Sequence, residues 1–182
     1  MRQLIRICLA LFIAGLVGGQ KSIAAECDVV GPLQQRWEGT RNLVIPLAEA
    51  FPEEKYDYKP TPEVRSFREQ LIHLISENQR YMAMVAGEAP KDQSQLERLT
   101  KREEILKTLV ESYDYGTRVL SNLDEQKAME MIPVPSFLGQ QMARWSVVMW
   151  NIVDNMDHYG NLVVYLRLNK IVPPRSAGQQ RR

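Results

Sequence analysis

Glycine and proline residues divide this chain into long helix-forming stretches, and this spacing constrains the fold more than any other feature. The stretches cover residues 62–87, 90–133 and 139–173, and the last two are interrupted only at Gly116 and Gly160. Apolar residues recur within them at helical spacing, without the alternation between turns that is typical of strands. The sequence therefore predicts an all-α protein.

Two short motifs mark where helices begin. The segments from Ser66 to Glu69 and from Thr100 to Glu103 both fit the capping box. In this motif a hydroxyl and a carboxylate each accept a hydrogen bond from a backbone amide that the first helical turn leaves without a partner. We therefore predict that helices begin near Ser66 and Thr100.

The remaining boundaries complete a set of four helices. A first helix is predicted over residues 33–51 with a kink at Pro46, and the last and longest over residues 141–169. The proline-rich segment 52–62 is expected to be an extended crossing between the first two helices. Four helices, one long crossing and no internal repeat predict a single-domain four-helix bundle.

The charge of the chain argues against nucleic-acid binding. The full sequence of 182 residues holds 23 basic and 22 acidic residues. Three of the basic residues lie in the first 25 positions and three at positions 175–182, so residues 26–174 hold 17 basic against 22 acidic side chains. A body with a net charge of −5 lacks the surface that neutralises phosphates, and nucleic acid is excluded as a partner.

Residues 1–25 resemble a secretory signal peptide. Arg2 and Arg6 precede an apolar run over residues 7–17, and the small residues of segment 22–25 form an exit site. A membrane anchor is the alternative, but the run is shorter than the ~20 residues that span a bilayer. We expect an exported protein, periplasmic or secreted, without a stable membrane anchor.

Cleavage of this leader would leave Cys27 as the lone cysteine of the mature chain. A lipid attached to Cys27 is disfavoured, because the charged Glu26 precedes it where a small residue is required. One cysteine cannot staple a domain internally, so the bundle must be held by its own core. We expect the thiol either to stay free or to form a disulfide with another chain.

Polar residues interrupt one face of the last predicted helix. At ~100° per residue, steps of four and three define one seam: Val147, Asn151, Asp154, His158, Asn161, Tyr165 and Leu168. A buried polar group costs about 1–3 kcal/mol unless it is hydrogen-bonded. Because the neighbouring arc is mostly apolar, a polar run from Asn151 to Asn161 suggests a functional site.

Asp154 and His158 stand one helical turn apart, at the spacing by which one helix offers two ligands to one metal. An ordinary helix ion pair has the same spacing, and spacing alone leaves both interpretations open. The other histidine, His73, lies at the edge of the apolar arc of the second helix, where a surface histidine is also expected. Glu77 follows one turn later on the same face.

Several segments of this chain resemble the DinB-like (DinB/YfiT) superfamily, in particular its exported members. They cover residues 51–67, 70–73, 150–152, 158–169 and 171–174. The resemblance implies an up-down-down-up four-helix bundle, which we assign to residues 26–176, followed by a basic disordered tail over residues 177–182. It also implies a divalent metal, often nickel or zinc, held by three histidines.

The implied ligands can be carried over residue by residue. The histidine of the second helix matches His73, and the last histidine of the fourth helix matches His158. The family's remaining histidine falls on Asp154, which is a departure. Two histidines and a carboxylate still form a known ligand set, so zinc, nickel, manganese and iron all remain candidates. Glu77 is a candidate fourth donor, with a solvated helix charge as its alternative.

Two classes of function follow. In the first, an enzyme uses a metal with open positions to activate water or a thiol and to polarise a carbonyl. The resemblance implies hydrolases and thiol-dependent transferases, and export favours hydrolysis of an unknown small molecule. Asp157 or Tyr165 would act as acid or base, with Asn161 as a further site residue.

In the second class, a noncatalytic binding or scaffold domain has kept the bundle while its metal site drifted. A homodimer is kept among the expected assemblies.

Overall fold

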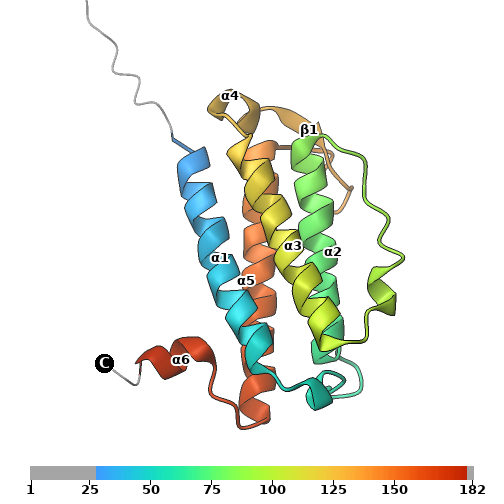
Figure 1. Cartoon of the computed structure of the whole chain (residues 1–182). Helices are drawn as coiled ribbons and strands as arrows, with labels where there is room; N and C mark the ends of the chain where they lie inside the picture. The colour runs from blue at the N-terminus through green and yellow to red at the C-terminus, as the bar shows by residue number, and fades with distance from the viewer. Residues whose placement is uncertain (1–27, 180–182) are drawn as a thin grey trace, which may run out of the picture.

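The computed structural model describes residues 28–179, and four long helices dominate it (Figure 1). They are α1 (Val30–Ala50), α2 (Phe67–Ala86), α3 (Arg102–Ser121) and α5 (Arg144–Leu168). Figure 1 shows α1 and α5 running in one direction along the bundle while α2 and α3 run in the other. The chain thus forms the all-α four-helix bundle that the sequence predicts, with the up-down-down-up order that the family resemblance implies.

The core lies where each helix meets two neighbours. Both α1 and α2 pack against α3 and α5, so α1 and α2 occupy one diagonal of the bundle and α3 and α5 the other. Aromatic rings close one end, with Phe51 stacked on Phe67 at a centroid distance of 4.0 Å. Trp37 is fully buried and donates its indole N–H to the backbone carbonyl of Tyr113 across the α1–α3 contact.

The capping box at Ser66 forms as predicted. The Ser66 hydroxyl accepts the Glu69 amide at 3.2 Å, and the Glu69 carboxylate accepts the Ser66 amide at 2.6 Å. The helix ends at Gly87, which adopts the left-handed conformation (φ 75°) that glycine takes without strain. Both ends of α2 are therefore fixed by local sequence.

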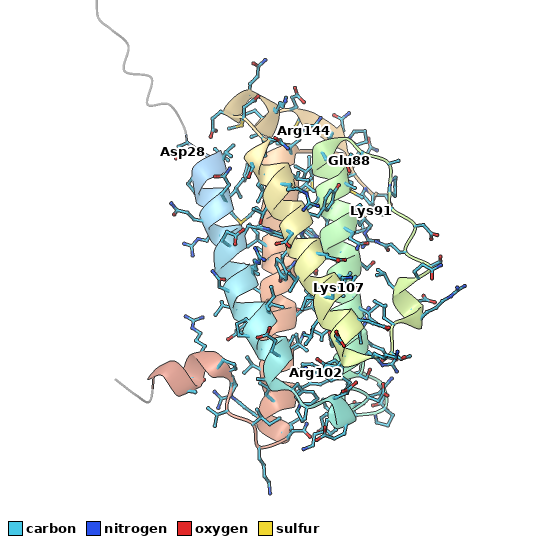
Figure 2. The ribbon with its side chains drawn as sticks, in the orientation of Figure 1. Asp28, Glu88, Lys91, Arg102, Lys107 and Arg144 are labelled. Atoms are coloured by element: carbon cyan, nitrogen blue, oxygen red, sulfur yellow. The ribbon has the colours of Figure 1, made fainter. Side chains whose placement is uncertain are left out.

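The capping box predicted at Thr100 is wrong. Helix α3 begins two residues later, at Arg102, and its N-cap residue Lys101 makes no side-chain capping bond. The Arg102 amide instead donates to the carboxylate of Glu53 at 3.4 Å, and the Arg102 guanidinium reaches the backbone carbonyl of Glu49. Figure 2 shows Arg102 at this end of the bundle. A tertiary partner has replaced the local cap.

The long crossing lies in a different place from the predicted one. Residues 52–62 turn the chain between antiparallel α1 and α2 at one end of the bundle and include a short 3-10 helix, η1 (Glu53–Lys55). The segment that runs the length of the bundle is 87–101, which contains η2 (Leu96–Arg98). Because α2 and α3 are parallel, their connection must return along the bundle.

The opposite end is closed by short elements that sequence periodicity did not predict. Helix α4 (Glu125–Ala128) is followed by strand β1 (Met131–Pro133), which pairs antiparallel with β2 (Gln141–Ala143). The last long helix therefore begins at Arg144 and not at Gln141. Residues 141–143 form a sheet with 131–133 instead of a first helical turn.

A sixth helix, α6 (Pro174–Gln179), follows α5 and contacts α1. It includes residues 177–179, which the sequence analysis assigns to a disordered tail. The predicted signal peptide, Cys27 and residues 180–182 lie outside the described residues. Within residues 28–179, no helix is both long enough and apolar enough to cross a membrane.

Candidate metal centre

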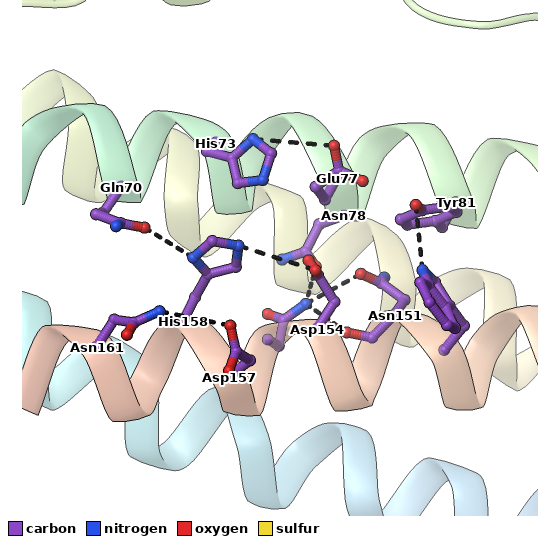
Figure 3. Close-up of polar contacts among 12 residues, drawn as sticks. Gln70, His73, Glu77, Asn78, Tyr81, Asn151, Asp154, Asp157, His158 and Asn161 are labelled. Carbon is purple, nitrogen blue, oxygen red and sulfur yellow. Dashed lines mark hydrogen bonds and ion pairs between the residues drawn. The ribbon is translucent and has the colours of Figure 1, made fainter. Parts of the chain in front are cut away.

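Helices α2 and α5 lie side by side and bring together three residues that are far apart in sequence. One ligand atom each of His73, Asp154 and His158 lies within 4.8 Å of the others (Figure 3). His73 comes from α2, and the other two residues lie one turn apart on α5. The structure thus places all three predicted ligands in one cluster between two helices.

The orientation of His158 is fixed by a buried hydrogen bond. Its Nδ1 lies 2.7 Å from the amide oxygen of Gln70. Because that oxygen can only accept, Nδ1 carries a proton, and in the neutral ring Nε2 therefore has the lone pair. Nε2 faces Asp154 at 3.8 Å from Oδ1, and the residue is 6% exposed. A metal-ligating histidine is held in this way by a partner behind it.

Asp154 has a carboxylate oxygen that lacks a partner. Its Oδ2 is buried and makes no hydrogen bond to any residue in the described part of the chain. Burial raises the pKa of this carboxyl above its usual value, an effect that the positive charge of a protonated His158 opposes. A cation in the cluster would satisfy this oxygen and offset its desolvation. The donor set therefore fits a divalent metal.

Glu77 lies beside His73 on α2 and is not one of the three clustered residues. The Nδ1 atom of His73 lies 3.9 Å from the Glu77 carboxylate, which is buried and also bonded by Arg80. Burial lowers the pKa of His73, the charge of Arg65 lowers it further, and the carboxylate of Glu77 opposes this shift. The lowered pKa favours the neutral imidazole, the form that binds metals. The carboxylate of Glu77, expected as a fourth donor, is engaged by Arg80.

Three other candidate residues lie away from the cluster. Asp157 and Asn161 are exposed on α5, where Asn161 donates to Asp157 at 3.4 Å. Tyr165 is buried and donates its hydroxyl to the backbone carbonyl of Arg65. A seam with steps of four and three rotates around a straight helix by about 20° per heptad. Asn161 and Leu168 have rotated outward for this reason.

A layer of buried amides supports the cluster, and the sequence analysis missed most of it. Asn155 donates to Asn78 at 2.9 Å and to the side-chain oxygen of Asn151 at 3.0 Å. It accepts a hydrogen bond from Tyr113 at 2.6 Å, which ties α3 to α2 and α5. Asn78 occupies a position in the apolar arc of α2 where a leucine would be ordinary. A polar residue at such a position is the signal that was available.

A cavity of about 420 Å³ opens beside His73. Apolar Ile72 and Leu96 line it together with the hydrogen-bonded pair Ser76 and Gln93. It lies between α2 and the crossing segment 87–101. This cavity gives a small molecule a route to one of the three clustered residues.

Comparison with known proteins agrees with this fold. The model of the DinB family matches residues 27–175. The uncharacterized protein YjoA of Bacillus subtilis strain 168 is 26% identical over 129 residues, which cover 70% of this chain and 82% of that protein.

Two solved structures share the architecture. The crystal structure of the DinB-like protein YjoA from Bacillus subtilis superposes with a TM-score of 0.63 at 18% identity, covering 76% of this chain and 92% of that one. The structure of a DinB-like protein from Bacillus cereus ATCC 10987 gives 0.69 at 12% identity, covering 79% and 95%. With the family model spanning nearly all of the described bundle, the chain belongs to the DinB family.

Proposed function

We propose that the protein binds a divalent metal through His73, Asp154 and His158 and uses it in hydrolysis or group transfer on a small molecule. The observation that carries this proposal is that Asp154 shares a cluster with two imidazoles while its buried Oδ2 has no hydrogen-bond partner in the described chain. Membership of the DinB family supports it.

The residues around the cluster have distinct roles in this proposal. When bound, a metal with three protein ligands and open positions polarises a carbonyl or activates water or a thiol. Gln70 keeps the proton of His158 on Nδ1, and the Glu77 carboxylate lies 3.9 Å from Nδ1 of His73. The cavity beside His73 admits the substrate. Two histidines and a carboxylate accept zinc, nickel, manganese or iron.

Hydrolysis is the favoured reaction, because we propose that the leader exports the protein to the periplasm or the medium. Low-molecular-weight thiols are mainly cytoplasmic, so a thiol-dependent transfer would lack its second substrate there. No described side chain at the cluster is positioned as an obvious nucleophile of its own. Activated water is therefore the simplest attacking group.

Elemental analysis of the purified full-length protein tests the metal proposal. Wild type, loaded with each candidate metal and then desalted, should retain one of them in a fixed ratio to the chain. His158→Ala should lose that metal, whereas Asp157→Asn should retain it because Asp157 is exposed and lies outside the cluster. Circular dichroism checks that both variants are folded.

The opposite result would favour the second functional class. If folded wild type retains no more metal than His158→Ala does, the cluster is not a metal site. A noncatalytic binding or scaffold domain would then be the better account of the Asp154 departure. The two classes thus differ in one measurement that requires no knowledge of the substrate.

A further inference from the structure

The cavity beside His73 carries charged side chains as well as an opening toward the metal cluster. It lies between α2 and the crossing segment 87–101, which runs alongside α2 in Figure 1. Its volume of about 420 Å³ is in the range of cavities that bind small molecules. A ligand that enters it meets four charged residues: Arg65, Arg68, Glu69 and Glu97.

The wall of this cavity is built by contacts within the protein. Ser76 donates its hydroxyl to the side-chain oxygen of Gln93 at 2.7 Å, and the Gln93 amide donates to the Ser76 backbone carbonyl at 2.9 Å. These two hydrogen bonds hold the crossing segment against α2. Ile72 and the buried Leu96 give the cavity an apolar side. A ligand is thus offered an apolar surface on a fixed wall.

Two of the four charged residues are already paired with groups outside the cavity. Arg68 donates to the carboxylate of Asp57 at 2.8 Å. The carboxylate of Glu69 accepts the Ser66 amide at 2.6 Å and pairs with Lys59 at 3.0 Å. Both side chains therefore serve to fix the start of α2. The other two charged residues are not engaged in this way.

Arg65 and Glu97 present one unpaired charge of each sign. Both are exposed, and neither side chain makes a hydrogen bond or an ion pair with any residue among 28–179. The backbone of Arg65 is nonetheless held in place, since its carbonyl accepts the hydroxyl of Tyr165. The charge of Arg65 is also close enough to His73 to help lower the pKa of that imidazole. The cavity therefore places an unpaired cation and an unpaired anion beside a candidate metal ligand.

We propose that this cavity binds a small zwitterion, with its carboxylate on Arg65 and its ammonium group on Glu97. A guanidinium binds a carboxylate through two parallel hydrogen bonds, and an ammonium group donates to a carboxylate. The apolar middle of the ligand lies against Ile72 and Leu96. An unblocked dipeptide has all three features in one molecule.

A dipeptide also contains the kind of group on which the proposed function acts, and the inference rests on that function. Arg65 precedes His73 by eight residues, or about 12 Å along the axis of α2. This separation leaves room for one amino-acid residue between the guanidinium and the metal cluster. In hydrolysis the oxygen of water bonds to the carbonyl carbon, the C–N bond breaks and the leaving nitrogen takes up a proton. The substrate class is therefore short unblocked peptides.

Isothermal titration calorimetry of the full-length protein in the presence of a chelator tests the two charge contacts. The probes are alanylleucine, its N-acetyl form and its C-terminal amide, and each blocked form lacks one charge. We expect alanylleucine to bind most tightly and each blocked form to bind about five-fold more weakly, as the loss of one exposed ion pair predicts. Free leucine, which carries both charges on one carbon atom, should also bind more weakly than alanylleucine.

Two substitutions show which residue contacts which end of the probe. Arg65→Gln should remove the difference between alanylleucine and its amide, while the effect of N-acetylation remains. Glu97→Gln should show the converse. Arg36→Gln and Glu103→Gln are matched controls, since both residues are exposed and lie outside this cavity. They should bind the probes as wild type does, and circular dichroism checks that every variant is folded.

Three results would each overturn the inference. They are a wild type that does not bind alanylleucine, one that binds leucine or a blocked form equally well, and an Arg65→Gln protein that still discriminates against the amide. Metal retention of Arg65→Gln and Glu97→Gln, measured separately, should equal that of wild type because neither residue belongs to the cluster. Since the titration contains no metal, failed peptide binding removes the substrate class, whereas failed metal retention removes the proposed function.

Discussion

At the scale of single residues, Asp154 is where stability and metal binding oppose each other. A carboxyl whose pKa is raised in the fold adds stability while it is protonated and loses that contribution as the pH rises through the folded pKa. Burial is the main cause of the raised pKa of Asp154. In metal-free protein at neutral pH, the ionised side chain therefore opposes folding.

This balance predicts the behaviour of Asp154→Asn. Without metal at neutral pH, the variant should unfold at the same or a higher urea concentration than wild type, because an amide has no charge to desolvate. The same variant should lose retained metal, since its only anionic ligand is gone. If Asp154 were instead the partner of His158 in a structural ion pair, the variant would be less stable and its metal content unchanged.

Sequence reasoning reached the three clustered residues but not the groups that hold them. His73, Asp154 and His158 were accessible because their positions match a family pattern and because two of them share a helix face. Gln70 lies in a segment that resembles the family, but its residue type alone does not indicate that it accepts a hydrogen bond from a histidine on another helix. Its role appears only when α5 brings His158 within 2.7 Å of its amide oxygen.

At the scale of helices, the contact between α1 and α3 depends on the absence of a side chain at Gly116. A Cβ there would lie 2.2 Å from the Trp37 ring, which is fully buried. We expect Gly116→Ala to lower the free energy of unfolding by about 1–3 kcal/mol, as overpacked cores do. Urea denaturation followed by circular dichroism measures this loss.

Gly39→Ala is the matched control for this prediction. Gly39 is an exposed helical glycine whose Cβ would meet nothing within 4 Å. The same substitution should therefore raise the free energy of unfolding by up to about 1 kcal/mol, because it reduces the freedom of the unfolded chain. Equal effects of the two substitutions would show that Trp37 moves aside at no cost.

Helix boundaries could be predicted from sequence where the determining contact is local. The Ser66 box formed because both of its partners lie within four residues. The Thr100 box did not form, because Glu53 from another connection supplies the bond to the Arg102 amide. Residues 141–143 form a strand for the same kind of reason, since the residues with which they pair lie about ten positions earlier in the chain. Long-range partners leave no mark in local periodicity.

At the scale of the whole molecule, the metal would join two helices that are separated in sequence by residues 87–143. Helix direction follows from connection length: the crossing 87–101 allows α2 and α3 to be parallel, which leaves α5 antiparallel beside α2. His73 then faces Asp154 and His158 across that contact. A ligand that binds only the folded arrangement stabilises it by mass action.

Metal removal should therefore be visible as a change in the thermal stability of the fold. We expect the metal retained by wild type to raise Tm, and a chelator to reverse the rise. At a free metal concentration 100 times Kd, the added stability is about 2.7 kcal/mol. His73→Ala should show no such rise, because the metal can then no longer link α2 to α5. Asp157→Asn should respond like wild type.

The same shift in Tm should depend on pH in a direction that the structure fixes. Histidine ligands must be neutral, so protons compete with the metal as the pH falls below the ordinary imidazole pKa of about 6.5. Burial and the nearby charges of Arg65 and His158 lower the pKa of His73, so this ligand remains neutral at lower pH than a free imidazole. The metal-induced rise in Tm should thus shrink as the medium is acidified. Because a carboxylate ligand stays ionised to lower pH than an imidazole, Asp154→His should make that loss steeper; an unchanged profile would mean that position 154 does not ligate the metal.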